Sequence, residues 1–284
     1  MAIPKVIHYC WFGRNKLPET AEKCINSWKT YFPDYEIKEW NESNYDVNKI
    51  IFTKEAYKAG MYAFVSDYAR LDILFNYGGI YFDTDVEVIK GFGNVLQNSV
   101  FMGFESLGCV NPGLGMGSEP HNSVLLEIME YYRKKHVLNK KGKNNTRTIV
   151  SITSEILKKY GLKNNNAIQN IAGIRIYPEE YFSPKSFETG ITKITENTCS
   201  IHHFDGSWVT KEGHKSTQER WDFYKKYWND EYVVNIYKKM KEYEKRTVDN
   251  FSLKILYKII IKRTLKKLMG ERIIGWIKSK KNGT

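Results

Sequence analysis

The sequence lacks the cysteine pairs that mark a metal knuckle or a redox motif. Its four cysteines, Cys10, Cys24, Cys109 and Cys199, all lie more than four residues apart. Neither a zinc-binding nor a redox-active CxxC pair is therefore present. Scattered cysteines in a chain of 284 residues are typical of a reducing compartment, so we expect a cytoplasmic protein.

Long apolar runs are also missing from the sequence. No stretch reaches the roughly 18 consecutive apolar residues of a membrane-spanning helix, so we expect none. The first residues, MAIPKVIHYCWFG, have no basic segment followed by an apolar one. We therefore expect a β-strand there and not a secretory signal peptide. No internal repeat is seen.

The net charge of +12 raises the question of nucleic-acid binding. Residues 251–284 contain ten Lys and Arg against one acid, Glu271, so they carry +9 of the total and leave +3 for the first 250 residues. Basic residues are thus not interleaved with aromatic ones across the body of the protein. We expect no nucleic-acid partner.

The basic tail, residues 251–284, has the pattern of an amphipathic helix. Lys254, Lys258, Lys262 and Lys266 recur every four residues, and apolar side chains lie on the other side. Basic amphipathic helices bind anionic membrane surfaces. We expect peripheral attachment to the inner face of the cell membrane; the alternative is a solvated helix that packs on the body.

Apolar periodicity predicts a β-α-β beginning. Residues 5–11 and 35–40 have the pattern of strands, and residues 17–32 that of a helix with one apolar face. Such a unit indicates a parallel sheet with crossover helices, and hence an α/β fold. We expect a catalytic domain over residues 1–215 and a helical C-terminal region over residues 216–284.

Later segments are assigned in the same way. Residues 122–135 have the pattern of a helix, and residues 174–177 and 199–203 that of strands. The stretch from Asn111 to Ser118 is dense in glycine, so we expect a loop. Residues 216–246 are heavily charged and expected to be helical.

Two carboxylates follow a short apolar strand candidate. Residues 80–82 come directly after Gly78-Gly79 and run into Asp83 and Asp85. Open α/β sheets bind their ligands at strand ends of this kind. Carboxylate oxygens suit Mg²⁺ or Mn²⁺, and such an ion would neutralise the charge of a departing diphosphate.

The D-x-D pair alone is a weak motif, since about one is expected by chance in a chain of this size. A calcium-binding loop beginning at Asp83 would need Gly at its sixth position and Glu at its twelfth, where this sequence has Val88 and Asn94. Asp83 and Asp85 as ordinary solvent-facing turn residues form the other alternative.

Three blocks in order make the pattern specific. They are D-Y-A-R at residues 67–70, L-x-x-x-G-G-I-Y-x-D-x-D at residues 74–85 and H-H-x-x-G-S-W at residues 202–208. Together they resemble glycosyltransferase family 32, the DXD sugar transferases of capsular polysaccharide and mannan synthesis. The catalytic core of the large clostridial glucosylating toxins is also similar. The resemblance covers roughly residues 3–105 and resumes at residues 201–208.

This resemblance implies a GT-A fold, a Rossmann-like sheet that binds a nucleotide-sugar, followed here by a helical extension. It implies a metal-dependent retaining hexosyltransferase with Mn²⁺ or Mg²⁺ as cofactor. The donor would be a nucleotide-diphosphate sugar, most simply a UDP-sugar, and the acceptor a glycan, lipid-linked, in capsular or surface polysaccharide synthesis. A nucleotide-sugar hydrolase and a non-catalytic sugar-binding module with the same pocket are the alternatives.

The resemblance also implies roles for single residues. Asp85 would bind the metal directly, and Asp83 would contact the ribose or reach the metal through water. Asp67 and Arg70 would hold the hydroxyls of the donor sugar, and with the two carboxylates they form the expected catalytic set. The expected nucleotide- and donor-binding residues are Cys10, Trp11, Ser66, Asp67, Arg70, Tyr81, Asp83, Ser207 and Trp208.

The third block supplies the last expectations. His202 and His203 alternate sides on a strand, so one of them faces the site. We expect His203 to complete the metal shell with Asp83 and Asp85; the alternative is a core histidine. Ser207 and Trp208 resemble a flexible loop that closes over the donor and excludes water, although Trp208 could equally be a core aromatic residue.

Overall fold

A computed structural model describes residues 2–105, 109–138, 147–206 and 211–229, together with 231, 233–235 and 237–238. Its contacts divide the chain into two units, Met1–Trp221 and Asp222–Thr284. The predicted boundary between residues 215 and 216 stays a prediction, and the tail at residues 251–284 lies outside the described residues. Among the helices that the structure describes, none is long and apolar enough to span a membrane.

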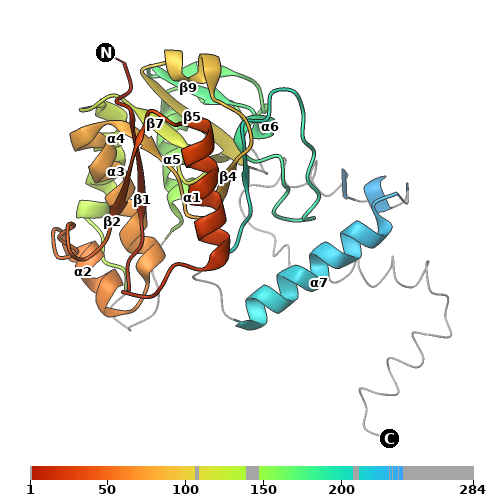
Figure 1. The fold of residues 1–284 in the computed structure, drawn as a ribbon, viewed down its shortest axis with the longest axis horizontal. Helices are drawn as coiled ribbons and strands as arrows, with labels where there is room; N and C mark the ends of the chain where they lie inside the picture. The colour runs from red at the N-terminus through yellow and green to blue at the C-terminus, as the bar shows by residue number, and fades with distance from the viewer. Residues whose placement is uncertain are drawn as a thin grey trace, which may run out of the picture. The chain divides into compact units, whose positions relative to one another are not determined.

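The described part of the chain contains strands and helices interspersed along the sequence (Figure 1). Its elements are β1 (Val6–Cys10), α1 (Glu19–Tyr31), β2 (Glu36–Trp40), α2 (Ile51–Lys58), α3 (Tyr62–Tyr77), β3 (Gly79–Tyr81), β4 (Val86–Val88), the 3-10 helix η1 (Gly93–Gln97), β5 (Val100–Glu105), β6 (Cys109–Asn111), β7 (Met116–Ser118), α4 (Ser123–Arg133), α5 (Ile149–Lys159), β8 (Gln169–Ile171), β9 (Ile174–Tyr177), α6 (Glu179–Phe182), β10 (Ser200–His202) and α7 (Lys211–Tyr227).

The main sheet is mixed. Within the described part of the chain its order is β2-β1-β3-β7-β5-β9-β8, and β6 pairs with β5 beside β7. The β2-β1-β3 portion is parallel, as the predicted β-α-β beginning requires, whereas β7 is antiparallel to both β3 and β5. The prediction of an α/β fold with a Rossmann-like beginning is confirmed.

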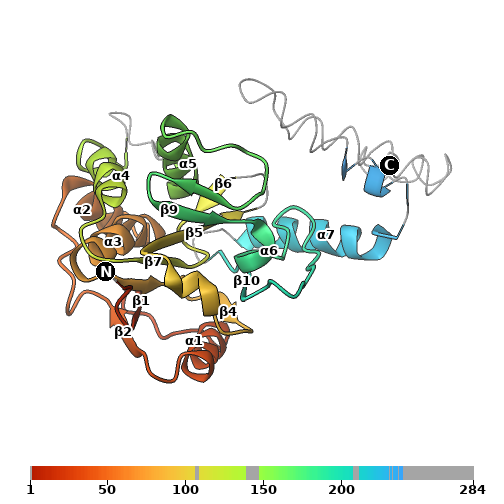
Figure 2. The ribbon, with the colours of Figure 1, turned by 90° about the horizontal axis from the view of Figure 1, so that it is seen from above.

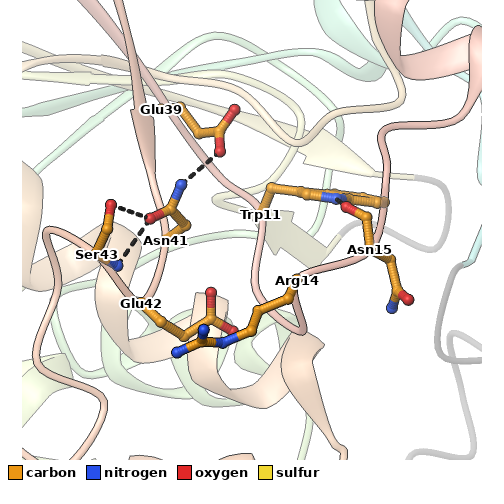
Figure 3. Close-up of a pocket in the computed structure, with 7 residues that line it drawn as sticks. All are labelled: Trp11, Arg14, Asn15, Glu39, Asn41, Glu42 and Ser43. Atoms are coloured by element: carbon orange, nitrogen blue, oxygen red, sulfur yellow. Dashed lines mark hydrogen bonds between the residues drawn. The ribbon is translucent and has the colours of Figure 1, made fainter.

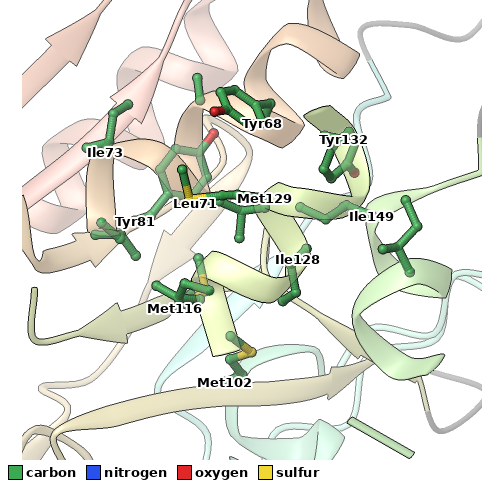
Figure 4. Packing of buried hydrophobic residues seen from close by; sticks show 14 of the residues in the cluster. Tyr68, Leu71, Ile73, Tyr81, Met102, Met116, Ile128, Met129, Tyr132 and Ile149 are labelled. Atoms are coloured by element: carbon green, nitrogen blue, oxygen red, sulfur yellow. The ribbon is translucent and has the colours of Figure 1, made fainter. Parts of the chain in front are cut away.

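Each face of the main sheet buries its own apolar cluster because side chains alternate along a strand. Ile80 and Phe82 point to the face that α1 covers, and Tyr81 points to the face that α2 to α5 cover. Figure 2 shows α1 on one side of β1 and α3 and α4 on the other. Figure 4 shows Tyr81 and Met102, two residues of the sheet, within the apolar cluster on the face that α2 to α5 cover. Helices and apolar side chains thus cover both faces of the sheet, so a ligand can bind only at the ends of the strands.

The glycine-dense stretch from Asn111 to Ser118 is not the loop that we expected. It forms the end of β6, a short turn and β7, which lies between β3 and β5. Gly117 explains the difference, because a Cβ there would lie 2.1 Å from the ring of Phe101. A neighbouring aromatic ring fills the space that a side chain would occupy, so a strand without large side chains is still buried.

A small second sheet adjoins the end of β3. Its strands β4 and β10 are antiparallel, with Ile201 opposite Glu87 and His202 opposite Val86. The indole N–H of Trp28 on α1 donates to the carbonyl oxygen of Val86 at 2.7 Å. This bond holds β4 against α1, on the face of the main sheet that α1 covers. A strand pair separated by more than 100 residues in sequence thereby reaches the Asp83-Asp85 segment.

The second unit is described only in part. Its residues before Tyr227 belong to α7, which begins at Lys211, earlier than the predicted helical segment at residues 216–246. Tyr224 and Tyr237 have ring centroids 5.8 Å apart, and both rings contact Trp228. These aromatic contacts are part of the packing that the structure describes in this unit.

Candidate functional site

The Asp83-Asp85 segment is the turn that joins the main sheet to the small sheet. The Phe82 N–H donates to the carbonyl oxygen of His8 at 3.1 Å, and the Val86 N–H donates to that of Asp83 at 3.1 Å. The turn therefore begins where β3 ends and closes where β4 starts. Both carboxylates are only partly covered, so they are open to a ligand at the strand end.

Arg70 is the buried cation of this site. Its guanidinium donates from Nη1 to Asp83 Oδ2 at 3.2 Å, and its Nη2 lies 3.1 Å from Asp83 Oδ1. On the same helix, three residues earlier, Asp67 Oδ1 lies 3.2 Å from Arg70 Nη2. Helical i,i+3 spacing thus puts Asp67 and Arg70 on one face of α3, where Arg70 lies between two carboxylates.

Two further residues from the expected donor pocket join this group. The hydroxyl of Tyr81 donates to Asp83 Oδ1 at 2.9 Å, and the Arg70 guanidinium carbon lies 4.9 Å from the Tyr81 ring centroid. Cys10 is buried beside them, and its burial raises the pKa of the thiol to about 12. Cys10 is therefore a neutral wall of the pocket and not a nucleophile.

Asp83, Asp85 and His202 form a group that fits a divalent metal. One ligand atom from each lies within 4.8 Å of the others, and His202 Nε2 is 3.2 Å from Asp85 Oδ1. Two carboxylates and an imidazole suit Mn²⁺ and related ions, and Mg²⁺ accepts such carboxylates. His202 Nδ1 is buried and has no hydrogen-bond partner among the described residues, and Asp85 orients the ring from its other nitrogen.

His203, the histidine that we expected among the metal ligands, belongs elsewhere. Its Nε2 lies 2.8 Å from Glu87 Oε2, and its backbone N–H donates to the carbonyl oxygen of Asp85 at 2.9 Å. The preference for His203 is thus corrected to His202. Strand alternation showed that one histidine faces the site, and only the register of β10 on β4 decides which.

Charge coupling keeps the Asp85–His202 pair ionic when no metal is bound. Burial alone would raise the pKa of Asp85, but the His202 charge and the Asp205 N–H, 2.9 Å from Asp85 Oδ2, lower it to about 2. Burial likewise opposes the charged form of His202, yet Asp85 and Asp83 raise its pKa to about 9. Because a histidine binds a metal ion as the neutral imidazole, His202 would have to release this proton to join Asp83 and Asp85 around an ion.

Asp67 is the second acid of the Arg70 group, and it lies deep in the protein. Burial raises its pKa to about 7, and the charge of Asp83 adds to this rise while Arg70 opposes it. Asp67 and Asp83 share a single guanidinium, so the site holds more negative than positive charge around Arg70. A donor sugar that offers hydroxyl hydrogens would find acceptors here.

The turn between β6 and β7 closes over Asp83. A Cβ at Gly113 would lie 2.0 Å from Asp83 Oδ2 and 2.9 Å from Arg70 Nη1. The Gly113 N–H donates to Asn111 Oδ1 at 2.7 Å, and Asn111 Nδ2 donates to Glu105 Oε2 at 2.5 Å. Glycine is therefore required for backbone to approach the carboxylate this closely.

A separate open cavity follows β1 and β2 at their carboxyl ends (Figure 3). It has a volume of about 360 Å³ and is lined by Trp11, Arg14, Glu39 and Glu42, among others. The Trp11 indole N–H donates to the carbonyl oxygen of Asn15 at 2.7 Å, which fixes the ring on the cavity wall. In sequence, Trp11 directly follows Cys10, which lies beside the Arg70 group.

The remaining predicted residues divide between described and undescribed parts of the chain. The Ser66 hydroxyl donates to the carbonyl oxygen of Tyr62 at 3.2 Å, within α3 and one residue before Asp67. Ser207 and Trp208 lie outside the described residues. The part of the expected set that the structure brings together is Cys10, Asp67, Arg70, Tyr81, Asp83 and Asp85.

Some residues near the site had no functional role in our predictions from the sequence. Arg14, Glu39 and Glu42 line the Trp11 cavity, but no motif marks them. Gly113 was assigned to a loop, although its place in a run of alternating glycines two residues after Asn111 is the signal that could have found it. Such a run indicates backbone that approaches a neighbour closely.

Part of the chain is similar to known glycosyltransferases. Residues 18–102 match a family model described as "Glycosyltransferase sugar-binding region containing DXD motif". Over 109 residues the chain is 33% identical to Inositol phosphoceramide mannosyltransferase 1 of Schizosaccharomyces pombe, an alignment that covers 35% of this chain and 33% of that protein. The chain thus spans about a third of the length of this curated relative.

Two solved structures are similar to a lower degree. One is the PaToxG glycosyltransferase, with 19% identity, a TM-score of 0.44 and coverage of 56% of this chain and 70% of that chain. The other is the galactosyltransferase LgtC in complex with donor and acceptor sugar analogues, with 12% identity, a TM-score of 0.32 and coverage of 76% and 95%.

The matched region contains most of the site. Asp67, Arg70, Asp83 and Asp85 all lie within residues 18–102, whereas His202 lies outside them. The DXD motif of the matched region corresponds to Asp83-Thr84-Asp85 in this sequence.

Proposed function

We propose that this chain, whose residues 18–102 match a glycosyltransferase sugar-binding region with a DXD motif, is a metal-dependent hexosyltransferase that takes a nucleotide-diphosphate sugar as donor. The observation that carries the proposal is the grouping of Asp83, Asp85 and His202 within 4.8 Å at the end of β3. The buried Arg70 guanidinium lies beside this group and holds the Asp83 carboxylate in place.

The metal would be Mn²⁺ or Mg²⁺, held by Asp85, Asp83 and His202. When bound, it would neutralise the negative charge that develops on the departing diphosphate. Asp85 and His202 already face each other at 3.2 Å, so little rearrangement is needed to aim both at one ion. Asp83 is bonded to Arg70 and Tyr81, which supports the proposal that it reaches the ion through water or contacts the ribose.

The protein residues would position the donor. Trp11 would stack on the base in the cavity after β1, and Asp67 with Arg70 would accept and donate hydrogen bonds to the sugar hydroxyls. Because Cys10 is buried and neutral, it would pack against the donor without reacting. Stacking and these hydrogen bonds fix the sugar carbon relative to the acceptor, which is the main contribution of orientation to such a transfer.

Finer features of the proposal come from the family resemblance. The transfer would retain the configuration of the sugar, with the acceptor hydroxyl attacking from the face that the diphosphate leaves. The leaving phosphate itself would accept the proton of that hydroxyl. A UDP-sugar is the proposed donor, and the acceptor would be a lipid-linked glycan in capsular or surface polysaccharide synthesis.

The basic tail would hold the enzyme at such an acceptor. Each Lys or Arg near an anionic lipid surface contributes about 1 kcal/mol. We therefore propose a cytoplasmic protein attached peripherally to the inner face of the cell membrane. Liposome flotation with anionic vesicles tests this: the full chain should float and a 1–250 truncation should not. Equal flotation of both would contradict the role of the tail.

A donor screen tests the enzymatic proposal. The purified protein with Mn²⁺ is incubated with UDP-glucose, UDP-galactose, their N-acetyl forms and GDP-mannose, and release of the nucleotide diphosphate is followed. We expect release from one donor, its loss with a chelator, and a decrease of at least about 100-fold in Asp85→Ala. Asp34→Ala removes an exposed carboxylate elsewhere and is the matched control.

The alternatives give different results in the same assay. A nucleotide-sugar hydrolase would release nucleotide at a rate that no added glycan acceptor increases. A sugar-binding module would bind a donor without releasing nucleotide. A normal rate in Asp85→Ala would contradict the metal-ligand role of this residue.

A further inference from the structure

A second cavity is lined by other residues of α3 than those of the proposed donor site around Arg70 and Asp83. Its volume is about 520 Å³, and its lining includes Trp40, Tyr45, Lys49, Asp72 and Tyr77. Trp40 belongs to β2, the edge strand of the main sheet. We call this space the edge cavity.

The edge cavity and the donor site use different faces of the same helix. Asp67 and Arg70 point toward Asp83, whereas Asp72 and Asn76 are four residues apart and line the edge cavity together. Asn76 Nδ2 donates to Asp72 Oδ1 at 3.0 Å. None of the residues that surround Arg70 and Asp83 lines the edge cavity, so it has its own chemistry.

A buried carboxylate forms the floor of the edge cavity. Asp72 is only 4% exposed, and both of its oxygens accept from Lys49 Nζ, at 2.9 and 2.7 Å. Besides the Asn76 bond, the Tyr45 hydroxyl donates to the carboxylate as well, 3.1 Å from Asp72 Oδ2. A buried charge is costly unless it is paired, and this one is paired at the wall of an open cavity. The Lys49 ammonium has three protons, so one is left for a ligand.

Aromatic rings form the wall of the edge cavity. Tyr77 is 56% exposed, and its ring centroid lies 5.4 Å from that of Trp40. Lys38 Nζ lies 4.5 Å from the Trp40 ring centroid and 5.4 Å from the Tyr77 ring centroid. An exposed tyrosine at a cavity mouth offers a flat apolar face next to polar groups.

The balance of charge selects the kind of ligand. Asp46 and Asp72 line the edge cavity against Lys49, and Lys38 lies over its aromatic wall. The charges of these two acids and two cations cancel, so the net charge at the edge cavity favours neither a phosphate nor a metal ion. Amide, carboxylate and ammonium groups beside aromatic rings instead match a neutral ring that has hydroxyls on its edge and C–H bonds on its face.

We infer that the edge cavity is a second carbohydrate-binding site, which takes a hexose residue of a glycan. The sugar ring would stack on Tyr77, and its hydroxyls would bond to Lys49 and Asn76. Such a site would keep a glycan chain on the protein apart from the residues that bind the donor. The inference does not depend on donor cleavage, so it can hold or fail separately from the proposed function.

Binding of simple glycosides to the full chain tests the inference. The probes are methyl α-mannoside, methyl β-galactoside and methyl β-glucoside, titrated in saturation-transfer NMR without nucleotide or added metal. At least one should bind, and Tyr77→Ala should weaken it at least tenfold, whereas Tyr77→Phe, which keeps the ring, should change it less than threefold. Tyr31→Ala removes another exposed tyrosine, on α1, and should leave binding unchanged.

Asp85→Asn separates the two sites. Binding that persists in Asp85→Asn and is lost in Tyr77→Ala supports a carbohydrate site in the edge cavity, whatever the donor screen gives. Three results would overturn the inference: no glycoside binds, binding is unaffected by Tyr77→Ala, or Asp85→Asn abolishes it. Circular dichroism of each variant establishes that the fold is retained, which is expected because Tyr77 is exposed.

Discussion

The Arg70 guanidinium and the Asp83 carboxylate form a two-point ion pair, with the nitrogens Nη1 and Nη2 at 3.2 and 3.1 Å from the oxygens Oδ2 and Oδ1. The pair joins α3 to the end of β3. Because both Arg70 and its second partner, Asp67, are buried, the pair sets the shape and the charge of the proposed donor site.

Replacing Arg70 with Met should destabilise the protein. It leaves the buried carboxylate of Asp67 and that of Asp83 without a cation, which costs about 3–5 kcal/mol when one partner of a buried pair is removed. The double variant Arg70→Met/Asp83→Asn should recover part of this loss. Urea unfolding of the unsubstituted protein, Arg70→Met, Asp83→Asn and the double variant measures the losses of stability. If the loss in the double variant is the sum of the two single losses, the two side chains are not coupled.

Replacing Gly113 with Ala should impair the site while the fold persists. The new Cβ would lie 2.0 Å from Asp83 Oδ2, so the carboxylate or the turn must move. We expect nucleotide release from the donor to fall about tenfold or more, in line with the effect of misplaced catalytic groups. Gly91→Ala is the matched control, since nothing lies within 4 Å of a Cβ there. Equal rates for both variants would contradict the prediction.

Replacing Trp11 with Ala should weaken nucleotide binding. Loss of stacking on a base costs about 1–3 kcal/mol where it has been measured, which is a rise in the dissociation constant of roughly 5- to 150-fold. Isothermal titration calorimetry measures this dissociation constant, with the nucleotide diphosphate that the donor screen identifies as the ligand. Trp11→Phe keeps an aromatic face and should lose less; unchanged affinity in Trp11→Ala would remove the cavity after β1 from the donor site.

His8 should make the protein less stable in mild acid. Its Nδ1 accepts from the Trp40 indole at 3.0 Å and its Nε2 lies 2.9 Å from the Gly78 carbonyl oxygen, so the folded state holds a neutral ring. Burial lowers its pKa from 6.5 to about 4. The unfolded state therefore binds a proton first, and the stabilising effect, complete above pH 6.5, is lost as the pH falls toward 4.

The size of this effect follows from the difference in pKa. Between pH 7 and pH 5 the His8 contribution should fall by about 2 kcal/mol. Gln at position 8 can keep one donor and one acceptor but does not titrate, so His8→Gln should show a smaller loss over this range. Urea unfolding at both pH values gives the comparison, and parallel losses in the two proteins would argue against His8. The difference between the two losses of unfolding free energy removes the contributions of the other titrating groups, among them Asp67.

The donor-site aspartates and the first half of the fold could be read from the sequence because the signals are local. The alternation of apolar residues in β1 and β2 and the helical spacing of α1 give a parallel β-α-β unit before any contact is known. Asp83 and Asp85 directly follow an apolar strand, and Asp67 and Arg70 are three apart on a helix. Each of these relations spans few residues, and backbone geometry then determines where the side chains point.

Tertiary structure alone decided the relations between distant segments. His202 and His203 are equivalent in sequence, and the register of β10 on β4 selects the first. The glycines between Asn111 and Ser118 have no side chains to mark a strand, so β7 is recognised only with Phe101 packed on Gly117. The edge cavity brings Lys49 to Asp72 across 23 residues. A sequence determines local geometry through the backbone, whereas packing between distant segments selects the register and the cavities.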